Sequence, residues 1–343
     1  MDTSINRTLR LLLTGNLSTS SEQAEDGLTT RELAIYGATL CFYIVVMVTA
    51  VLGNLLVLMA TFQNQNLRDS ATNLLLANLA VADFCQGAIS LPLRIAEEVM
   101  SNFYLCRVSI PTTIFFGGTS NLTILFISIE RFVSIYRPYA YCRIFTDMVV
   151  KVVIAFSWIT VAAFSLTSAS SIVWRRHISS SCRFPVYLSK AYILALYIYV
   201  HIVPITLVIL LYGFILKASC IQTRRIYGQQ LSVTSNSGSF EMEERSRVLQ
   251  RLAHLKAIKV VSVVVGLFIV LVLPIIIIDA VEILGGGRPP EGFVKGAVCL
   301  IYANNCVNVF VYAGFNQEYR QTFKRILNKF KLALFGRCVR SYA

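Results

Sequence analysis

Charged residues are scarce in this chain of 343 residues: Asp, Glu, Lys and Arg make up 14% of it, whereas 56% of its residues are hydrophobic. A soluble domain carries about 25% charged residues. A soluble protein with long buried helices would need a polar surface to cover them, and this chain has too little polar sequence to supply one. Histidine is also scarce, with His177, His201 and His254 on three different segments. Because no metal-ligand spacing such as His-Glu-x-x-His occurs, we expect a chain that is not an enzyme.

Long stretches with few or no charges take up most of the sequence. A helix needs about 20 apolar residues to cross the hydrocarbon core of a bilayer, and seven stretches are near that length or longer. Lipid offers no hydrogen-bond partner to the backbone, so each stretch should be a helix. The sequence therefore predicts an all-α membrane protein with a bundle of seven transmembrane helices. The stretches are Leu33–Leu67, Ser70–Leu93, Val108–Ile129, Val152–Trp174, Ala191–Leu216, Val260–Ile278 and Gly296–Gln317.

The net charge of +13 would suit a nucleic-acid partner, but its distribution along the chain favours a membrane topology. With the N-terminus outside, the cytoplasmic segments hold 20 of the 31 Lys and Arg residues and 7 of the 18 Asp and Glu residues. This asymmetry predicts an extracellular N-terminus, a cytoplasmic C-terminus and a basic face toward anionic membrane lipid. Two glycosylation acceptor triplets, at Asn6 and Asn16, agree with an external N-terminus, and no cleavable signal peptide is visible. We expect a multi-pass plasma-membrane protein and no nucleic-acid partner.

Three parts of the chain differ in composition. Residues 1–32 are predicted to form an extracellular tail, residues 33–314 the transmembrane domain, and residues 315–343 a short amphipathic helix with a cytoplasmic tail. Apolar residues in this last part recur at helical spacing between basic ones, as in a helix on a membrane surface. Cys338 follows it and is either a palmitoylation site or an unmodified thiol.

The longest predicted loop joins the fifth and sixth helices. It contains a Ser-, Asn- and Gly-rich stretch, Ser232–Ser239, which is typical of a flexible linker. Residues Arg245–Lys259 include good helix formers, so we expect the sixth helix to extend into the cytoplasm. No inverted repeat of the kind found in many transporters is visible.

Short motifs occur in a fixed order along the predicted helices. They are Gly53-Asn54, Leu79–Asp83, Cys106, Glu130-Arg131-Phe132, Trp158, Cys182, Pro204, Tyr212, Phe268, Pro274 and Asn308–Tyr312. Each is weak alone, but the ordered set resembles the rhodopsin-like (class A) G-protein-coupled receptors over about Tyr36 to Leu327. The local sequence, such as Asn78–Phe84, looks most like the amine-receptor-like branch. The resemblance implies an extracellular ligand, a heterotrimeric G protein, arrestin and a receptor kinase as partners.

Asp83 lies in the middle of the second predicted helix. A carboxylate within the membrane is costly unless it has a partner, so we expect Asp83 to have a function. The third and seventh helices offer polar partners in Ser120, Asn304 and Asn308. By resemblance, these four residues form the family's sodium site, in which sodium stabilises the resting state. The alternative is a protonated Asp83 held by hydrogen bonds without an ion; no other cofactor is expected.

Glu130 and Arg131 are adjacent at the cytoplasmic end of the third helix, where Glu130 can hold Arg131 in an ion pair. By resemblance, this pair breaks on activation and Arg131 then faces the G protein; the alternative is a simple interfacial anchor. The residues that the resemblance assigns to activation are Glu130, Arg131, Tyr212, Pro274, Asn308 and Tyr312. The resemblance also implies a disulfide between Cys106 and Cys182.

The chain departs from the family pattern at three positions. Val272 stands where the family usually has a tryptophan, two residues before Pro274, and Val309 stands where a proline usually follows Asn308. His254 stands where many relatives have an acidic partner for the arginine. From this missing constraint on Arg131, we predict raised basal activity.

The family's ligand residues exclude two ligand classes. Amine receptors have an aspartate in the outer third helix, where this chain has Thr113, so a simple monoamine is disfavoured. Opsins have a lysine in the middle of the seventh helix, where this chain has Tyr302, so retinal is excluded; Lys295 lies too near the outer end. A peptide, a lipid or another small molecule remains. By position, the pocket is expected to consist of Thr113, Phe116, Gly117, Phe184, Val272, Val298 and Tyr302.

Further residues around the expected pocket allow two interpretations. Basic residues of the second external loop could attract an acidic ligand, although a solvated charged loop is the default. Tyr192, Tyr197 and His201 could join the pocket or serve only as packing and interface residues. The basic loop residues are Arg175, Arg176, Arg183 and Lys190.

Overall fold

Seven membrane-spanning helices form the body of the protein. The computed structural model describes residues 30–100, 103–174, 183–233, 241–287 and 289–340, with backbone only at 30–32, 103, 219–233, 241–261 and 334–340. In this part of the chain, seven segments are helical, long and apolar enough to cross a membrane, so the predicted transmembrane bundle is confirmed. The spans are Leu33–Gln63, Ala71–Met100, Tyr104–Tyr136, Asp147–Ala169, Lys190–Ala218, Ser262–Ile283 and Glu291–Phe315.

Two of the spans combine α-helix with a wider π-helical turn. The second span consists of α4 (Ala71–Cys85), η1 (Gln86–Ser90) and α5 (Leu91–Met100). The fifth consists of α10 (Lys190–Tyr197), η2 (Ile198–Ile202) and α11 (Val203–Val233). A proline follows each turn, and its ring clashes with the carbonyl four residues earlier, which a wider turn relieves. The prolines are Pro92 and Pro204.

The other spans are single helices joined by short ones. The spans are α2 (Thr30–Gln63), α6 (Phe103–Tyr136), α8 (Asp147–Ala169), α12 (Glu241–Ile283) and α13 (Glu291–Phe315). The short connecting helices are α3 (Gln65–Arg68), α7 (Pro138–Ile144) and α9 (Phe184–Tyr187). Helix α2 thus begins inside the segment that the sequence assigned to the tail.

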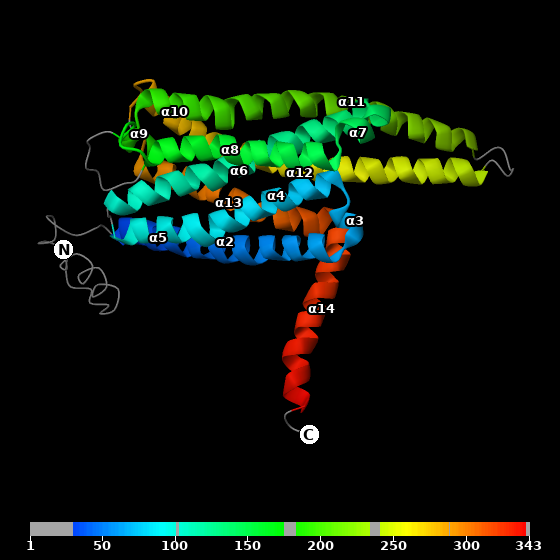
Figure 1. Cartoon of the computed structure of the whole chain (residues 1–343), viewed down its shortest axis with the longest axis horizontal. Helices are drawn as coiled ribbons and strands as arrows, with labels where there is room; N and C mark the ends of the chain where they lie inside the picture. The colour runs from blue at the N-terminus through cyan, green and yellow to red at the C-terminus, as the bar shows by residue number, and fades with distance from the viewer. Residues whose placement is uncertain (1–29, 101–102, 175–182, 234–240, 288, 341–343) are drawn as a thin grey trace, which may run out of the picture.

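The spans run along the long axis of the molecule, as Figure 1 shows. We call the end with α5 and α9 the mouth end and the end with α3 and α7 the α14 end. Helices α11 and α12 continue side by side beyond the bundle at the α14 end (Figure 1). The predicted extension of the sixth helix is confirmed, because α12 begins at Glu241. Helix α11 extends as far, to Val233, which the sequence pattern did not predict.

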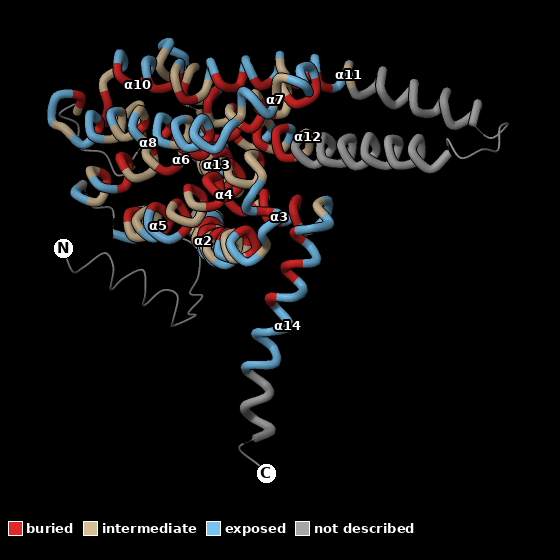
Figure 2. The backbone as a smooth tube through the Cα atoms, turned by 45° about the vertical axis from the view of Figure 1, so that its right-hand side comes forward, coloured by how far each residue is buried: buried red, intermediate tan, exposed pale blue. Residues whose placement is uncertain are grey.

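Buried residues lie toward the inside of the bundle and exposed ones toward its outside (Figure 2). Many of the exposed residues are large and apolar. Leu52, Ile159 and Val270 are each more than 60% exposed. In water such a surface would be unfavourable, but lipid tails cover it without penalty. The exposed apolar side chains therefore agree with a chain that spans a membrane.

Helix α14 (Gln317–Arg340) leaves the bundle at a steep angle (Figure 1). The Oδ1 atom of Asn316 accepts hydrogen bonds from the backbone N–H groups of Glu318 and Tyr319, which caps the new helix. The Tyr319 ring stacks on Tyr312 at 5.5 Å, and its hydroxyl lies 3.0 Å from Thr61 Oγ1. Burial raises the pKa of Tyr319 to about 12, so this contact stays uncharged. The helix is longer than the short one that the sequence predicted.

Candidate functional site

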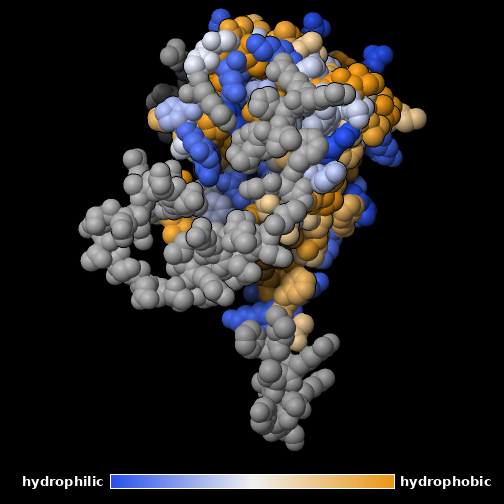
Figure 3. Space-filling view, turned by 90° about the vertical axis from the view of Figure 1, so that its left-hand side faces the viewer, coloured by the Kyte–Doolittle hydropathy of each residue, from blue (hydrophilic) through white to orange (hydrophobic). Residues whose placement is uncertain are grey.

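A cavity of about 1080 Å³ opens at the mouth end of the bundle. Figure 3 looks onto this end and shows hydrophilic side chains near its centre, between flanks of hydrophobic ones. Residues from α2, α5, α6, α9, α12 and α13 contribute to its wall. The π-helical turns add Gln86 from η1 and His201 from η2.

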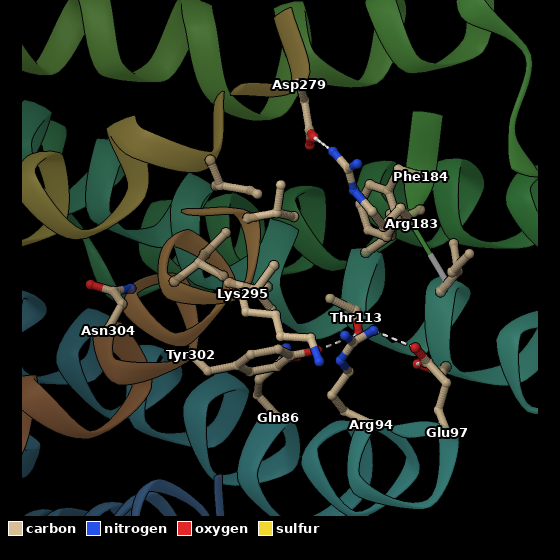
Figure 4. Close-up of a pocket in the computed structure, with 18 of the residues that line it drawn as sticks. Gln86, Arg94, Glu97, Thr113, Arg183, Phe184, Asp279, Lys295, Tyr302 and Asn304 are labelled. Atoms are coloured by element: carbon tan, nitrogen blue, oxygen red, sulfur yellow. Dashed lines mark hydrogen bonds and ion pairs between the residues drawn. The ribbon is translucent and has the colours of Figure 1, made fainter. Parts of the chain in front are cut away.

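Five of the seven predicted pocket residues line this cavity. Thr113 and Tyr302 face each other across it, with their hydroxyl oxygens 3.3 Å apart (Figure 4). The five are Thr113, Gly117, Phe184, Val298 and Tyr302. Tyr197 and His201 also line the cavity, whereas Tyr192 donates a hydrogen bond to the Phe164 carbonyl outside it.

The other two predicted pocket residues, Phe116 and Val272, are not on the wall of this cavity. Helix α6 turns Thr113 and Gly117 toward the cavity, and Phe116 lies beside that face, with its ring 6.4 Å from that of Trp158. Val272 has no exposed surface and belongs to the central hydrophobic core. A valine is too short to reach the cavity from that position.

A charged network lies at the rim on the side of α5 and α13. Arg94 forms ion pairs with Glu97 and Glu98, and Lys295 pairs with Glu98 at 3.1 Å and with Glu291 at 3.5 Å. Glu97 is 4% exposed and also accepts a hydrogen bond from Ser109. Figure 4 shows Arg94 and Lys295 beside Tyr302, with Glu97 on the far side of Arg94. Each of the two cations is therefore shared between two carboxylates.

A second charged network lies on the side of α12. Arg183 pairs with Asp279 at 3.3 Å and with Glu282 at 2.6 Å, and Tyr197 donates its hydroxyl proton to Asp279. Figure 4 shows Arg183 beside Phe184, with its guanidinium directed at Asp279. The default interpretation of Arg183 as a solvated loop residue is thus wrong, because a nearby carboxylate pair draws it inward. Lys190 is exposed, and Arg175 and Arg176 lie outside the described residues.

Asp83 is fully buried below the cavity. Its Oδ1 accepts a hydrogen bond of 2.9 Å from Ser120, and its Oδ2 accepts one of 2.9 Å from Asn308. Asn304 lies on the cavity wall. A buried carboxylate beside a hydroxyl oxygen is the hard oxygen donor set that a small cation prefers, so these residues fit a sodium ion.

At the α14 end, Glu130 holds Arg131 in a closed arrangement. Arg131 donates to both carboxylate oxygens of Glu130, at 2.6 and 2.8 Å. Thr72 and Tyr141 also donate to Glu130, which has no exposed surface. Burial and the Glu130 charge raise the pKa of Tyr141, so it remains a donor. The buried carboxylate is therefore satisfied on all sides.

Two tyrosines of the expected activation set form no hydrogen bond with this ion pair. The hydroxyls of Tyr212 and Tyr312 are buried and have no hydrogen-bond partner in the part of the chain that the structure describes. Pro274 lies within α12. A buried polar group without a partner is unfavourable, so this arrangement leaves both hydroxyls free to form a bond in another conformation.

The remaining predicted sites are only partly described. Cys106 is buried and disulfide-bonded. Its expected partner Cys182 lies outside the described residues, as do Asn6 and Asn16. Cys338 lies in the last turns of α14, where only the backbone is described.

Comparison with known proteins decides the family. A model of the "7 transmembrane receptor (rhodopsin family)" matches residues 53–312. The chain belongs to this receptor family. The D(1A) dopamine receptor of Xenopus laevis is 24% identical to it, over 89% of this chain and 75% of the relative. Trace amine-associated receptor 8c of Mus musculus is 28% identical, over 82% of this chain and 83% of the relative.

These similarities confirm the predicted amine-receptor-like branch of the rhodopsin family. Trace amine-associated receptor 9 of Mus musculus is a further relative, 27% identical over 81% of both chains. All three relatives are receptors, so the prediction that this chain is a receptor and not an enzyme is confirmed.

Sequence reasoning missed several charged residues of this receptor. Among carboxylates within the membrane it discussed Asp83, but Glu97 and Asp279 are buried as well, each 4% exposed. The spacing of Arg94 and Glu97 on one helix face could have indicated an ion pair. No sequence signal connects Asp279 with Arg183, which is 96 residues away.

Proposed function

We propose that this receptor binds an extracellular ligand in the mouth-end cavity and activates heterotrimeric G proteins through its α14 end. The mouth end then faces outward, and the α14 end, with the basic segments of the chain, faces the cytoplasm. Arrestin, a receptor kinase and anionic lipid beneath α14 complete the expected set of partners.

The observation that carries this proposal is the closed Glu130–Arg131 pair at the opposite end from an open cavity. Arg131 is 12% exposed and donates to Glu130 through two nitrogens, so it is held without being fully buried. A charge-assisted pair of this kind can open if a partner offers Arg131 an alternative acceptor. Ligand and G protein could then act on the same conformational equilibrium from opposite ends.

The cavity chemistry supports the exclusion of retinal and of a simple monoamine. Tyr302 hydrogen-bonds with Thr113 in the positions where a Schiff-base lysine and an amine-binding aspartate would lie. Lys295 is engaged with Glu98 and Glu291 at the rim. A monoamine would have to displace Arg94 or Arg183 from an existing ion pair, although the relatives are named for dopamine and trace amines.

A nucleotide-exchange measurement tests the proposal. Membranes containing the full chain are mixed with a panel of purified Gα proteins and a broad ligand library, and guanine-nucleotide exchange is measured. We expect exchange with at least one Gα protein and its loss in Arg131→Ala. The control Lys190→Ala changes an exposed residue at the start of α10, at the mouth end and outside the cavity wall, and should keep exchange. Exchange with none of the Gα proteins, with or without ligands, would overturn the proposal.

A further inference from the structure

The cavity changes character with depth. The charged residues of its wall lie near the mouth: Arg94, Glu97 and Glu98 in the last turns of α5, and Lys295 in the first turns of α13. Two wall residues lie much deeper. Gln86 is 14 residues from Met100, where the second span ends at the mouth, and Gly117 is 14 residues from Phe103, where α6 begins there. At 1.5 Å per residue this is a depth of about 20 Å.

The deepest part of the cavity is polar but uncharged. Asn304 reaches the same level, 13 residues into α13. Asn121 and His201 complete it, with Asn121 Nδ2 3.1 Å from His201 Nδ1. We call Gln86, Gly117, Asn121, His201 and Asn304 the amide floor. Four helices therefore present amide and imidazole groups to one space below a charged rim.

Gln86 has an unmet hydrogen-bond requirement in this floor. The residue is 3% exposed, lines the cavity, and its Oε1 has no hydrogen-bond partner in the described structure. A buried acceptor without a donor is unfavourable, so a ligand group that supplies an N–H or O–H there gains affinity. A group without a donor would leave the oxygen unsatisfied.

Gly117 provides the space in front of Gln86. A Cβ atom at Gly117 would have Gln86 Nε2 as its nearest neighbour, at 4.0 Å. At the adjacent Gly118, by contrast, a Cβ atom would come within 2.7 Å of Val161, so that glycine is required by helix packing. The missing side chain at Gly117 is therefore not filled by protein, and it deepens the cavity toward Gln86.

The charges around the floor select an uncharged group. Asp83 does not line the cavity, because Ser120, which does, lies between them and donates a hydrogen bond to Asp83 Oδ1. An ammonium in the floor would be desolvated with no carboxylate on the described cavity wall at that depth, and a carboxylate would be desolvated near the like charge of Asp83. An amide, a hydroxyl or a ring N–H meets neither difficulty.

We propose that the amide floor binds an uncharged, hydrogen-bond-donating head group of the ligand, which occupies the space that Gly117 leaves beside the Gln86 amide and donates to Gln86 Oε1. This inference rests on the proposed function only in treating the cavity as a ligand site. It makes Gln86 and Gly117 determinants of ligand specificity, with the charged rim left to contact the outer part of the ligand.

Three matched probes test the head-group preference. The purified full-length receptor in lipid nanodiscs is titrated with benzamide, with benzylamine, which is an ammonium at neutral pH, and with toluene. The dissociation constants follow from the concentration dependence of the melting temperature. We expect benzamide to bind at least about tenfold more tightly than benzylamine, the factor that one unmet buried hydrogen bond represents.

Variants separate a binding role from a structural one. Gln86→Leu should weaken benzamide about tenfold and leave toluene nearly unchanged. Gln86→Glu should invert the preference, because a carboxylate attracts the ammonium. Gly117→Ala should fold and weaken every probe by filling the space, whereas the control Gly213→Ala, where a Cβ meets nothing within 4 Å, should leave them unchanged.

Several outcomes would overturn the inference. The unchanged receptor could bind benzylamine more tightly than benzamide, or benzamide could fail to raise the melting temperature up to its solubility limit. Gln86→Leu could also bind benzamide with the same affinity as the unchanged receptor. If the Gln86 variants do not fold, equal affinities in Gly117→Ala and the unchanged receptor would overturn it as well. The probes bind without a G protein, so failure of nucleotide exchange alone counts against the coupling function and not against this site.

Discussion

At the scale of single residues, this receptor contains more buried charge than its sequence suggests, and nearly all of it is paired. Glu130, Glu97 and Asp279 each contact a cation and at least one hydroxyl. Asp83 differs, because its two hydrogen bonds come from uncharged side chains. A buried carboxylate of this kind is stabilised by either a proton or a small cation.

The environment of Asp83 predicts a specific response to sodium. We expect sodium chloride to raise the melting temperature relative to choline chloride at equal ionic strength. An ion at about ten times its dissociation constant contributes about 1.4 kcal/mol, or a few degrees. In Asp83→Asn the two salts should give the same melting temperature, and Ser120→Ala should give a smaller difference. An unchanged sodium response in Asp83→Asn would contradict the site.

The second rim network predicts a loss of stability when its cation is removed. Arg183→Leu leaves Asp279 and Glu282 close together without a counter-charge, which should destabilise the receptor by about 1–3 kcal/mol. Thermal unfolding measures the change, with the exposed Lys190→Ala as control. The double variant with Asp279→Asn should recover part of the loss. If the two single changes simply add, Arg183 and Asp279 are not energetically coupled.

At the scale of helices, Val309 has a packing role that its departure from the family pattern did not suggest. A Cβ atom at Gly53 of α2 would lie 2.9 Å from Val309 Cγ2 of α13. The two helices approach closely because a glycine faces a valine. The proline that the family usually has after Asn308 is replaced here by a side chain that fills this contact.

This contact predicts a pair of compensating changes. Gly53→Ala should lower the free energy of unfolding by about 1–3 kcal/mol, because the added methyl overlaps Val309. Adding Val309→Ala should restore part of the loss, as measured by thermal unfolding. Gly37→Ala is the matched control, since a Cβ there has no neighbour within 4 Å. Equal losses in the single and double variants would show that Val309 is not the obstacle.

Helix α12 also carries a prediction about resting activity. His254 lies in its extension beyond the bundle, at the position where the resemblance to the receptor family implies an acid that restrains the arginine. His254→Glu should give Arg131 a second acceptor and lower nucleotide exchange without agonist. Agonist-free exchange is compared with that of His254→Gln, which adds no charge. If agonist-free nucleotide exchange does not decrease in His254→Glu, the lack of an acid at this position does not raise the resting activity.

At the scale of the whole molecule, the sequence predicts the bundle well and the orientation of its side chains less well. The seven spans follow from hydropathy because the thickness of the bilayer sets their length. The direction of a side chain depends on how each helix is rotated against its neighbours, which the sequence does not give, and Phe116 and Val272 do not line the cavity as expected. The interpretation of Arg183 as a solvated loop residue was wrong because its partners, Asp279 and Glu282, lie on α12, far along the chain.

The length of α12 beyond Pro274 has a mechanical consequence. From Pro274 to Glu241 the helix measures about 50 Å at 1.5 Å per residue. If this arm stays straight and pivots at the proline, a rotation of about 10° carries its far end about 9 Å. The helix then acts as a lever with a long output arm. A movement smaller than a bond length at Ile275 and Ile276, which line the cavity, becomes a displacement as large as a side chain at the other end of the molecule.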